Sequence, residues 1–213
     1  MYIQFDTLTP SERYFAMVQS IVPRPIAWVL TKNSGENTGN NGLNLAPFSF
    51  FTGICSDPPL VLFSIGKKPS GDEQGAEKDT RKNIREHKEF VLHIAGTDML
   101  QAVNLSAATL NYGDSEIEQQ HLETVPFEGF SLPRLKNCSI AMGCSLYRID
   151  EVGNVPQAVI YGEIKTMYVN DDVLDTSNPN RLIIDPKKLD PLSRLGGGHY
   201  AGLGDLLSAI RPD

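Results

Sequence analysis

One short segment of the chain combines residue types that suit the binding of a phosphate. Residues 78–83 read Lys-Asp-Thr-Arg-Lys-Asn after a polar loop, which predicts a helix start with Asp79 as its cap. The free N–H groups and the positive dipole end of such a start attract anions. Thr80 adds a hydroxyl, Asn83 lies one turn later on the same side, and Lys78 adds a positive charge. A phosphate monoester, with a charge of roughly −1.5 to −2, matches this set. The alternative is a capped surface helix with a solvated basic face.

A second segment, residues 44–51, combines the marks of a strand with a proline in its middle. It reads Asn-Leu-Ala-Pro-Phe-Ser-Phe-Phe. Proline cannot donate to a sheet ladder, so Pro47 belongs on an edge, at a bulge or where a ligand meets the backbone. The neighbours Asn44, Ala46 and Ser49 would leave a shallow surface for a flat ring with polar edges. The alternative is a core strand with a proline bulge. Together with the phosphate segment, it matches a phosphorylated ring cofactor.

The composition excludes several classes of protein. The formal net charge of −7 argues against a nucleic-acid binder, because phosphate neutralisation needs a basic surface. No run of about 18 apolar residues exists, so we expect no membrane span. The first residues lack a signal peptide's features and the three cysteines form no Cys-x-x-Cys pair, which predicts a cytoplasmic protein with buried, reduced thiols. Apart from ordinary surface neighbours, none of the four histidines pairs with another histidine, a cysteine or a carboxylate at helical spacing, so no metal site is predicted.

The helices are predicted from their start signals. Thr9, Pro10 and Glu12 indicate a helix that begins with a capping box and has proline at its first position. Further helices are expected to begin at Asp79, at Thr97 or Asp98, and near Ser115.

The remaining chain predicts mainly strands. They are expected at residues 2–5, 26–31, 44–51, 60–65, 89–94, 138–149 and 158–169. An Asn- and Gly-rich turn at residues 33–42 joins two of them, and the strands at 26–31, 44–51 and 60–65 are expected to form an antiparallel meander. The set as a whole predicts one domain built on a closed or partly closed β-barrel.

Several motifs occur in a fixed order that resembles a known family. They read Arg-Pro-Ile-Ala-Trp-Val at 24–29, then residues 44–51, Asp-Pro-Pro at 57–59, residues 78–83 and Glu-Phe-Val at 89–91. This ordered set resembles the flavin reductase-like family over residues 20–170. The closing residues 194–200 are similar to a tail in the branch that includes nitrilotriacetate monooxygenase component B and other flavoproteins.

The resemblance implies a fold and a division of the chain. The fold would be mainly β with helices, an antiparallel, Greek-key-like, FMN-binding split β-barrel at residues 20–170. Residues 1–19 would form an N-terminal strand and helix, and residues 171–213 a C-terminal extension that closes over the flavin. FMN would lie at a homodimer interface, and electrons would pass to a monooxygenase or another acceptor. The positions that match the family's cofactor contacts are Arg24, Trp28, Asn44, Ala46, Pro47, Ser49, Phe50, Lys78, Asp79, Thr80, Asn83, Arg194, Gly197 and Tyr200.

One departure from the family pattern leaves the reaction open. Many smaller members carry a Gly-Asp-His triplet that is linked with NADH use, but here the matching strand reads Ala-Val-Ile-Tyr-Gly-Glu-Ile at 158–164. The first hypothesis is an FMN-dependent oxidoreductase of the NAD(P)H:flavin reductase type. The second is an FMN-binding electron carrier or sensor without NAD(P)H activity, and the third a barrel without a cofactor. Because the flavin carries the redox chemistry, no catalytic residue is predicted.

Overall fold

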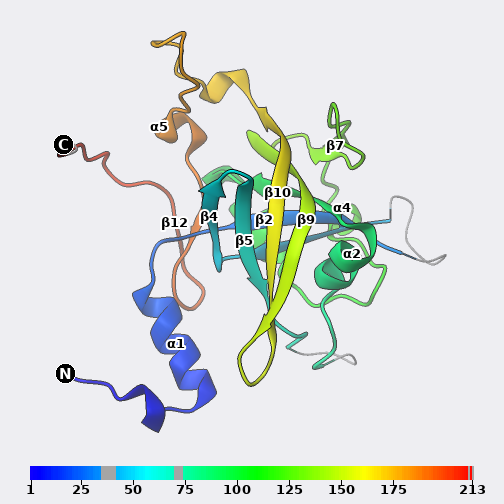
Figure 1. The fold of residues 1–213 in the computed structure, drawn as a ribbon, viewed down its shortest axis with the longest axis vertical. Helices are drawn as coiled ribbons and strands as arrows, with labels where there is room; N and C mark the ends of the chain where they lie inside the picture. Colours follow the sequence, from blue (N-terminus) through cyan, green and yellow to red (C-terminus); the bar gives the residue numbers. More distant parts are fainter. Residues whose placement is uncertain (35–41, 70–73, 211, 213) are drawn as a thin grey trace.

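A computed structural model describes residues 1–34, 42–69, 74–210 and 212, and its centre is one antiparallel sheet of seven strands (Figure 1). Every neighbouring pair in this sheet is antiparallel. Across the sheet the order is β3 (Leu43–Phe48), β2 (Ala27–Lys32), β6 (Glu89–Ile94), β9 (Ile140–Val152), β10 (Gln157–Val169), β5 (Pro59–Ile65) and β4 (Phe51–Ser56). The mainly β, antiparallel fold class is therefore confirmed.

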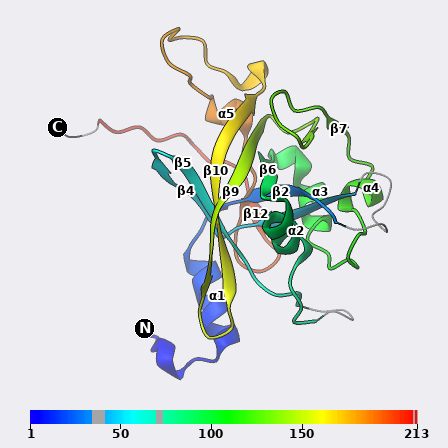
Figure 2. The same cartoon turned by 45° about the vertical axis from the view of Figure 1, so that its right-hand side comes forward.

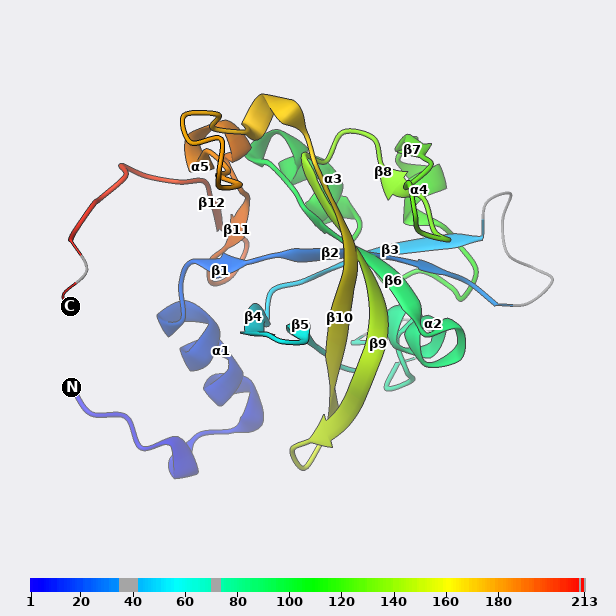
Figure 3. The same cartoon turned by 45° about the horizontal axis from the view of Figure 1, so that its top comes forward.

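Short helices and two small sheets surround this sheet. The helices are α1 (Pro10–Ser20), α2 (Asp79–His87), α3 (Leu100–Leu105), α4 (Glu116–Gln119) and α5 (Pro186–Leu189), with 3-10 turns η1 (Phe5–Thr7), η2 (Thr97–Met99) and η3 (Asp171–Val173). The small sheets are β1 (Arg24–Pro25) with β11 (Ser193–Arg194) and β12 (Tyr200–Ala201), and β7 (Thr124–Val125) with β8 (Arg134–Leu135). In Figures 2 and 3, α2 and α4 lie on one side of the sheet, while α1 and both chain ends lie on the other. Within the described residues, no helix is long and apolar enough to span a bilayer.

The alternating side chains of β2 contribute to two separate cores. Trp28 and Leu30 point into a cluster that also takes residues from α3 and α4. Ala27 and Val29 point to the opposite face and join a cluster that contains Phe63 and Phe90. Because successive side chains of a strand point to opposite faces, both faces of β2 are buried, and the strand provides a rigid support for its neighbour β3.

Several local predictions are confirmed. The capping box of α1 is formed, with Thr9 accepting from the backbone of Glu12 and Pro10 at the first helical position. The strands expected at 26–31, 60–65, 89–94, 138–149 and 158–169 are β2, β5, β6, β9 and β10 with small shifts of their ends. Ser115 caps α4. The turn expected at 33–42 falls largely on residues 35–41, which lie outside the described residues.

Other local predictions are wrong. Residues 2–5 form no strand, and the chain instead enters the 3-10 turn η1. The helix expected from Thr97 or Asp98 has Gly96 as its N-cap, begins as a 3-10 turn and ends at Leu105. Thr97 does not cap it because its hydroxyl donates to Asp190 instead. Cys55 is exposed, whereas the other two cysteines are buried as expected.

The meander is also wrong, because residues 44–51 do not form one strand. The chain leaves β3 after Phe48 and starts β4 at Phe51, and these two strands lie at opposite edges of the sheet. β2 pairs with β3, but β5 pairs with β4 and β10. Because only two residues connect the edge strands β3 and β4, the sheet must curl to bring its two edges close together. The two strands do not pair with each other.

The prediction that Pro47 lies on an edge is confirmed. The backbone N–H of Leu45 donates to the Glu116 carboxylate at 2.9 Å, so it points away from β2. Pro47 comes two residues after Leu45 on the strand, so its backbone nitrogen faces the same open side. Proline therefore costs β3 no ladder hydrogen bond.

Candidate functional site

The start of α2 has no side-chain cap. Its N-cap residue is Lys78, whose side chain makes no capping hydrogen bond, and Asp79 is the first helical residue rather than the predicted cap. The Asp79 carboxylate instead forms an ion pair with Lys68, whose Nζ lies 2.8 Å away. The first N–H groups of a helix have no carbonyl partners within it, so this start keeps its capacity for an anion.

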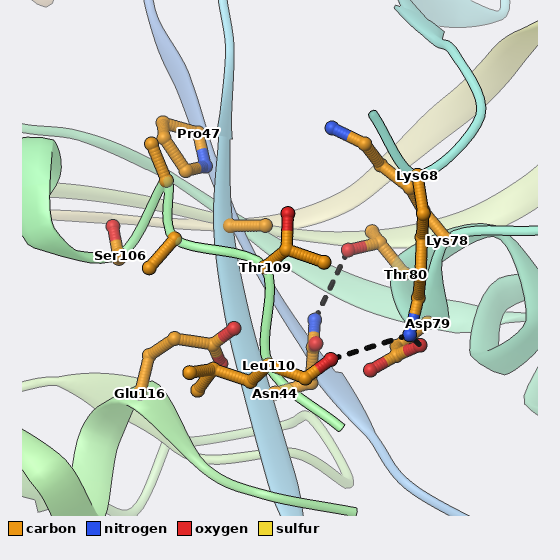
Figure 4. Close-up of a pocket in the computed structure, with 13 residues that line it drawn as sticks. Asn44, Pro47, Lys68, Lys78, Asp79, Thr80, Ser106, Thr109, Leu110 and Glu116 are labelled. Atoms are coloured by element: carbon orange, nitrogen blue, oxygen red, sulfur yellow. Dashed lines mark hydrogen bonds and ion pairs between the residues drawn. The ribbon is translucent and has the colours of Figure 1, made fainter. Parts of the chain in front are cut away.

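A cavity of about 80 Å³ lies in front of this helix start (Figure 4). Its walls come from β3, from the start of α2 and from the chain that follows α3. The lining residues are Asn44, Ala46, Pro47, Lys68, Lys78, Asp79, Thr80, Ser106, Ala107, Ala108, Thr109, Leu110 and Glu116. The two sequence segments that were predicted to form a cofactor site thus face each other across one cavity.

Lys78 gives this cavity a positive charge. In the part of the chain that the structure describes, no carboxylate pairs with it, and its Nζ lies 5.7 Å from the centroid of the Phe48 ring. Burial lowers the pKa of Lys78, and the charge of Lys68 lowers it further. A nearby anion would favour the charged form of Lys78 and offset the cost of its burial. Lys68 is already paired with the Asp79 carboxylate, so Lys78 is the cation that an anionic ligand would meet.

A buried network of polar side chains supports the cavity from behind. Asn44 donates to the Thr80 hydroxyl at 3.0 Å and to the Thr31 hydroxyl at 3.3 Å. Asn83 donates to the same Thr31 oxygen at 3.0 Å and is fully buried. Asn83 does not line the cavity, so the structure places it behind the residues that do.

A second cavity, of about 140 Å³, adjoins the first at Pro47 and Ala107. The C-terminal hairpin β11–β12 covers it: the guanidinium of Arg194 lies 4.4 Å from the Tyr200 ring centroid, and the Tyr200 hydroxyl donates to Asn104 at 3.1 Å. Gly197, with φ of 61°, belongs to the turn of this hairpin and lines neither cavity. The lining residues are Ile26, Pro47, Ser49, Val103, Asn104, Ala107, Arg194 and Tyr200.

A wider hollow of about 460 Å³ lies on the other side of Pro47. Phe50 and Tyr14 of α1 line it, with their ring centroids 6.4 Å apart, and Ser49 and Lys78 connect it to the two cavities. Three hollows thus meet at Pro47, on the open edge of the sheet.

Arg24 and Trp28 are buried beside the cavities rather than in their walls. The Arg24 guanidinium donates to the carbonyls of Ile21 at 2.8 Å and Leu195 at 2.9 Å, and to the Ser49 hydroxyl at 3.3 Å. The indole N–H of Trp28 donates to Ser106, a residue of the first cavity, at 2.8 Å. Both residues therefore contact the site through a neighbour.

Sequence reasoning missed Glu116, which lines the first cavity and is 6% exposed. Burial is the main cause that raises the pKa of Glu116 to about 7, and the charges of Asp79 and Asp114 act in the same direction. The hydrogen bond from the Leu45 N–H lowers the pKa and offsets part of this rise. Its helix start was predicted from Ser115, but no local signal shows that the helix docks on β3. Lys68 and the segment 106–110 were missed for the same reason.

The comparison with known proteins decides the family. The flavin reductase like domain matches residues 18–192, which is most of the chain. The chain belongs to the flavin reductase-like family. Its motifs at 24–29, 44–51 and 78–83 all lie within this match, so the resemblance inferred from them is confirmed.

Three solved structures resemble the whole chain. Nitrilotriacetate monooxygenase component B from Bacillus cereus is 31% identical, with a TM-score of 0.85 and 98% of each chain covered. The 2-nitrobenzoate 2-nitroreductase NbaA of Pseudomonas fluorescens is 27% identical, with a TM-score of 0.83, 100% of this chain and 96% of its own covered. A flavin reductase with a split barrel domain from Shewanella frigidimarina is 18% identical, with a TM-score of 0.80 and full coverage of both chains, and this likeness shows the fold.

Proposed function

We propose that this chain binds FMN along the open edge of β3. The phosphate would lie at the start of α2, with Lys78, Thr80 and the first N–H groups of the helix around it. The ring would lie toward Ser49, beneath the β11–β12 hairpin. The observation that carries the proposal is that a cationic cavity at a helix start joins a partly apolar cavity at Pro47.

The sizes of the cavities support a ligand that occupies both. A pocket for a small molecule or cofactor commonly measures about 300–1,000 Å³, and the cavities here measure about 80 and 140 Å³. A cofactor with a charged end and a flat end would therefore need both of them and part of the wider hollow of about 460 Å³, which also borders Pro47. Asn44 and Ala46 line only the first cavity and would contact the chain that joins phosphate and ring.

We propose further that the protein is an oxidoreductase of the NAD(P)H:flavin reductase type. Bound FMN would supply the redox chemistry by accepting a hydride and passing electrons on. The chain itself would hold the phosphate, orient the ring and shield it from water, and the hollow beside Phe50 offers access for a second reactant. The likeness to a monooxygenase component B supports a monooxygenase as the electron acceptor.

The alternative function is an FMN-binding electron carrier or sensor that does not use NAD(P)H. The observation that favours it is the absence of the Gly-Asp-His triplet before Gly162. In place of that triplet the chain has Val-Ile-Tyr on strand β10, which is paired on both sides by β9 and β5.

A homodimer with FMN near its interface also belongs to this proposal. Large apolar side chains of α1 are exposed, among them Tyr14, Phe15 and Met17. The edge strand β4 is exposed over most of its length. Tyr14 lines the hollow beside Phe50, and β4 begins at the next residue, Phe51, so a second copy that covered both would also cover this hollow. The location of the protein in the cytoplasm stays a prediction.

Fluorescence and the visible spectrum of the purified protein test FMN binding and reduction by NADH or NADPH in one experiment. We expect FMN to quench the fluorescence of Trp28, the sole tryptophan, because its indole hydrogen-bonds to a cavity residue. Anaerobic NADH or NADPH should then bleach the flavin absorbance if the protein is a reductase. Bound flavin that neither nucleotide bleaches would favour the carrier or sensor. If FMN causes no quenching and the protein holds no flavin, FMN binding is contradicted. Sedimentation equilibrium would test the dimer.

A further inference from the structure

The carboxyl group of Glu116 has an unusual position for an acidic residue, because it lies inside the cavity that we assign to an anion. Glu116 is the first residue of α4, and one carboxylate oxygen accepts the N–H of Leu45 on the open edge of β3. The side chain is almost completely buried and lines the cavity together with Asn44 and Asp79. This one contact both docks α4 on the strand and places a titratable group at the site.

Few charges compensate this carboxyl group. Asp79 of α2 and Asp114, just before α4, repel a negative charge on it. Lys68 is held by Asp79 at 2.8 Å, and Lys78 lies at the helix start beside the Phe48 ring. Strand β3 and the segment 106–110 contain no titratable side chain. The surroundings therefore favour the neutral acid as soon as a further negative charge enters.

We propose that Glu116 couples the binding of the anionic cofactor in this cavity to the uptake of one proton. This inference rests on the proposed function. The proton comes from solvent and attaches to the Glu116 carboxylate, which becomes a neutral carboxylic acid, and no other bond changes. Two effects drive the uptake: the ligand excludes water from around Glu116, and its phosphate adds negative charge. The Leu45 N–H continues to donate to the acid, so the docking of α4 is kept.

The sign of the pH dependence follows from this coupling. Burial already places the pKa of Glu116 at about 7 in the free protein, and the ligand would raise it further. Above about pH 7 the free protein has lost the proton that the complex still holds, so affinity falls as pH rises, by at most about tenfold per pH unit, until the complex loses the proton as well. The phosphate itself titrates near pH 6 and is a dianion in this window.

Isothermal titration calorimetry with FMN tests the inference directly. At pH 8, in buffers that differ in ionisation enthalpy, the slope of the observed enthalpy gives the number of protons taken up. We expect about one proton per FMN for the native chain and close to none for Glu116→Gln, which keeps an acceptor oxygen for Leu45. The Gln variant should also bind FMN more tightly than the native chain at pH 8 to 9. Glu118→Gln, on the same helix but outside the cavity lining, is the matched control and should keep the slope.

The outcomes separate the two proposals. FMN binding with no buffer dependence in the native chain would overturn the role of Glu116 and leave FMN binding intact. Equal proton uptake by the native chain and Glu116→Gln would assign the proton to another group. Absence of any FMN binding would overturn the proposed function, and this inference with it. If Glu116→Gln does not fold, a native slope of zero protons still overturns the inference.

Discussion

The side-chain amide of Asn44 donates to the hydroxyl of Thr80 at 3.0 Å and so joins the edge strand β3 to the first turn of α2. Both side chains are almost fully buried, and they are 36 positions apart in the chain. The strand that carries the proposed ring side and the helix that carries the proposed phosphate side are therefore fixed to each other before any ligand binds. Such preorganisation reduces the entropy cost of binding.

Removal of Lys78 or of the Thr80 hydroxyl should weaken FMN binding. Lys78→Ala and Thr80→Ala are each expected to lose about 1–3 kcal/mol, the usual range for a hydrogen bond to a charged group. Riboflavin, which lacks the phosphate, should lose much less, and fluorescence titration with both ligands measures the difference. Lys82→Ala is the control, because Lys82 lies over the Tyr112 ring at 3.6 Å and does not line the cavity. Equal losses for FMN and riboflavin would show that these residues do not hold the phosphate.

Gly162 on β10 should not tolerate a side chain. A Cβ atom there would lie 2.3 Å from Cζ of Phe90, which is fully buried. Gly162→Ala is therefore expected to cost about 1–3 kcal/mol of unfolding free energy, as overpacked core substitutions do. Gly53→Ala, on the edge strand β4 of the same sheet, is the control, since its Cβ would meet nothing within 4 Å. Urea denaturation of the two variants should separate them, and similar midpoints would contradict this packing role.

The comparison of sequence and structure shows which information is local. The capping box at Thr9 and Glu12 involves residues three apart, so the sequence contains all of it. The position of Pro47 on an edge follows from its missing N–H and was also predictable. The break after Phe48 was not, because the separation of β3 and β4 depends on the pairing of β5 with the distant strand β10.

The same distinction holds for the candidate site. Lys78 and Thr80 were predicted to lie at an anion site from their place at a helix start. Asp79 was assigned as the cap because the residue type favours it, but its partner Lys68 lies in the preceding loop and draws its carboxylate away from the helix N–H groups. Glu116 comes from a region without periodicity, and only the three-dimensional contact with Leu45 shows its role.

Arg24 should hold the N-terminal helix and the C-terminal hairpin to the barrel. Its guanidinium donates to carbonyls near the end of α1 and to Leu195, and it is 4% exposed. Arg24→Met keeps much of the apolar stem but leaves these carbonyls without their donor. We expect a loss of about 1.5–3 kcal/mol and faster proteolysis near residues 18–24. Arg85→Met, which removes an exposed arginine paired with Glu77, should change neither property.

His93 should make the protein sensitive to acid. Its Nδ1–H donates to the Trp28 carbonyl and its Nε2 accepts the Leu135 N–H. The neutral imidazole therefore satisfies both hydrogen bonds. Burial lowers the pKa of His93 to about 4, from 6.5 for an exposed histidine. The unfolded chain therefore binds a proton in the window from about pH 6.5 to 4 that the folded chain does not bind. Stability should fall by about 3 kcal/mol as the pH decreases through this window, and this contribution is fully present above it.

Denaturation at a series of pH values measures the contribution of His93. His93→Gln should be less stable than the native chain at neutral pH, because its amide donor and acceptor do not lie where the two ring nitrogens do, but its stability should fall less steeply between pH 6.5 and 4. The control is His121→Asn, since His121 is exposed and its φ of 53° suits asparagine. That variant should keep the native slope. If His93→Gln also keeps it, the acid sensitivity arises from other groups, and the neutral state of His93 does not govern it.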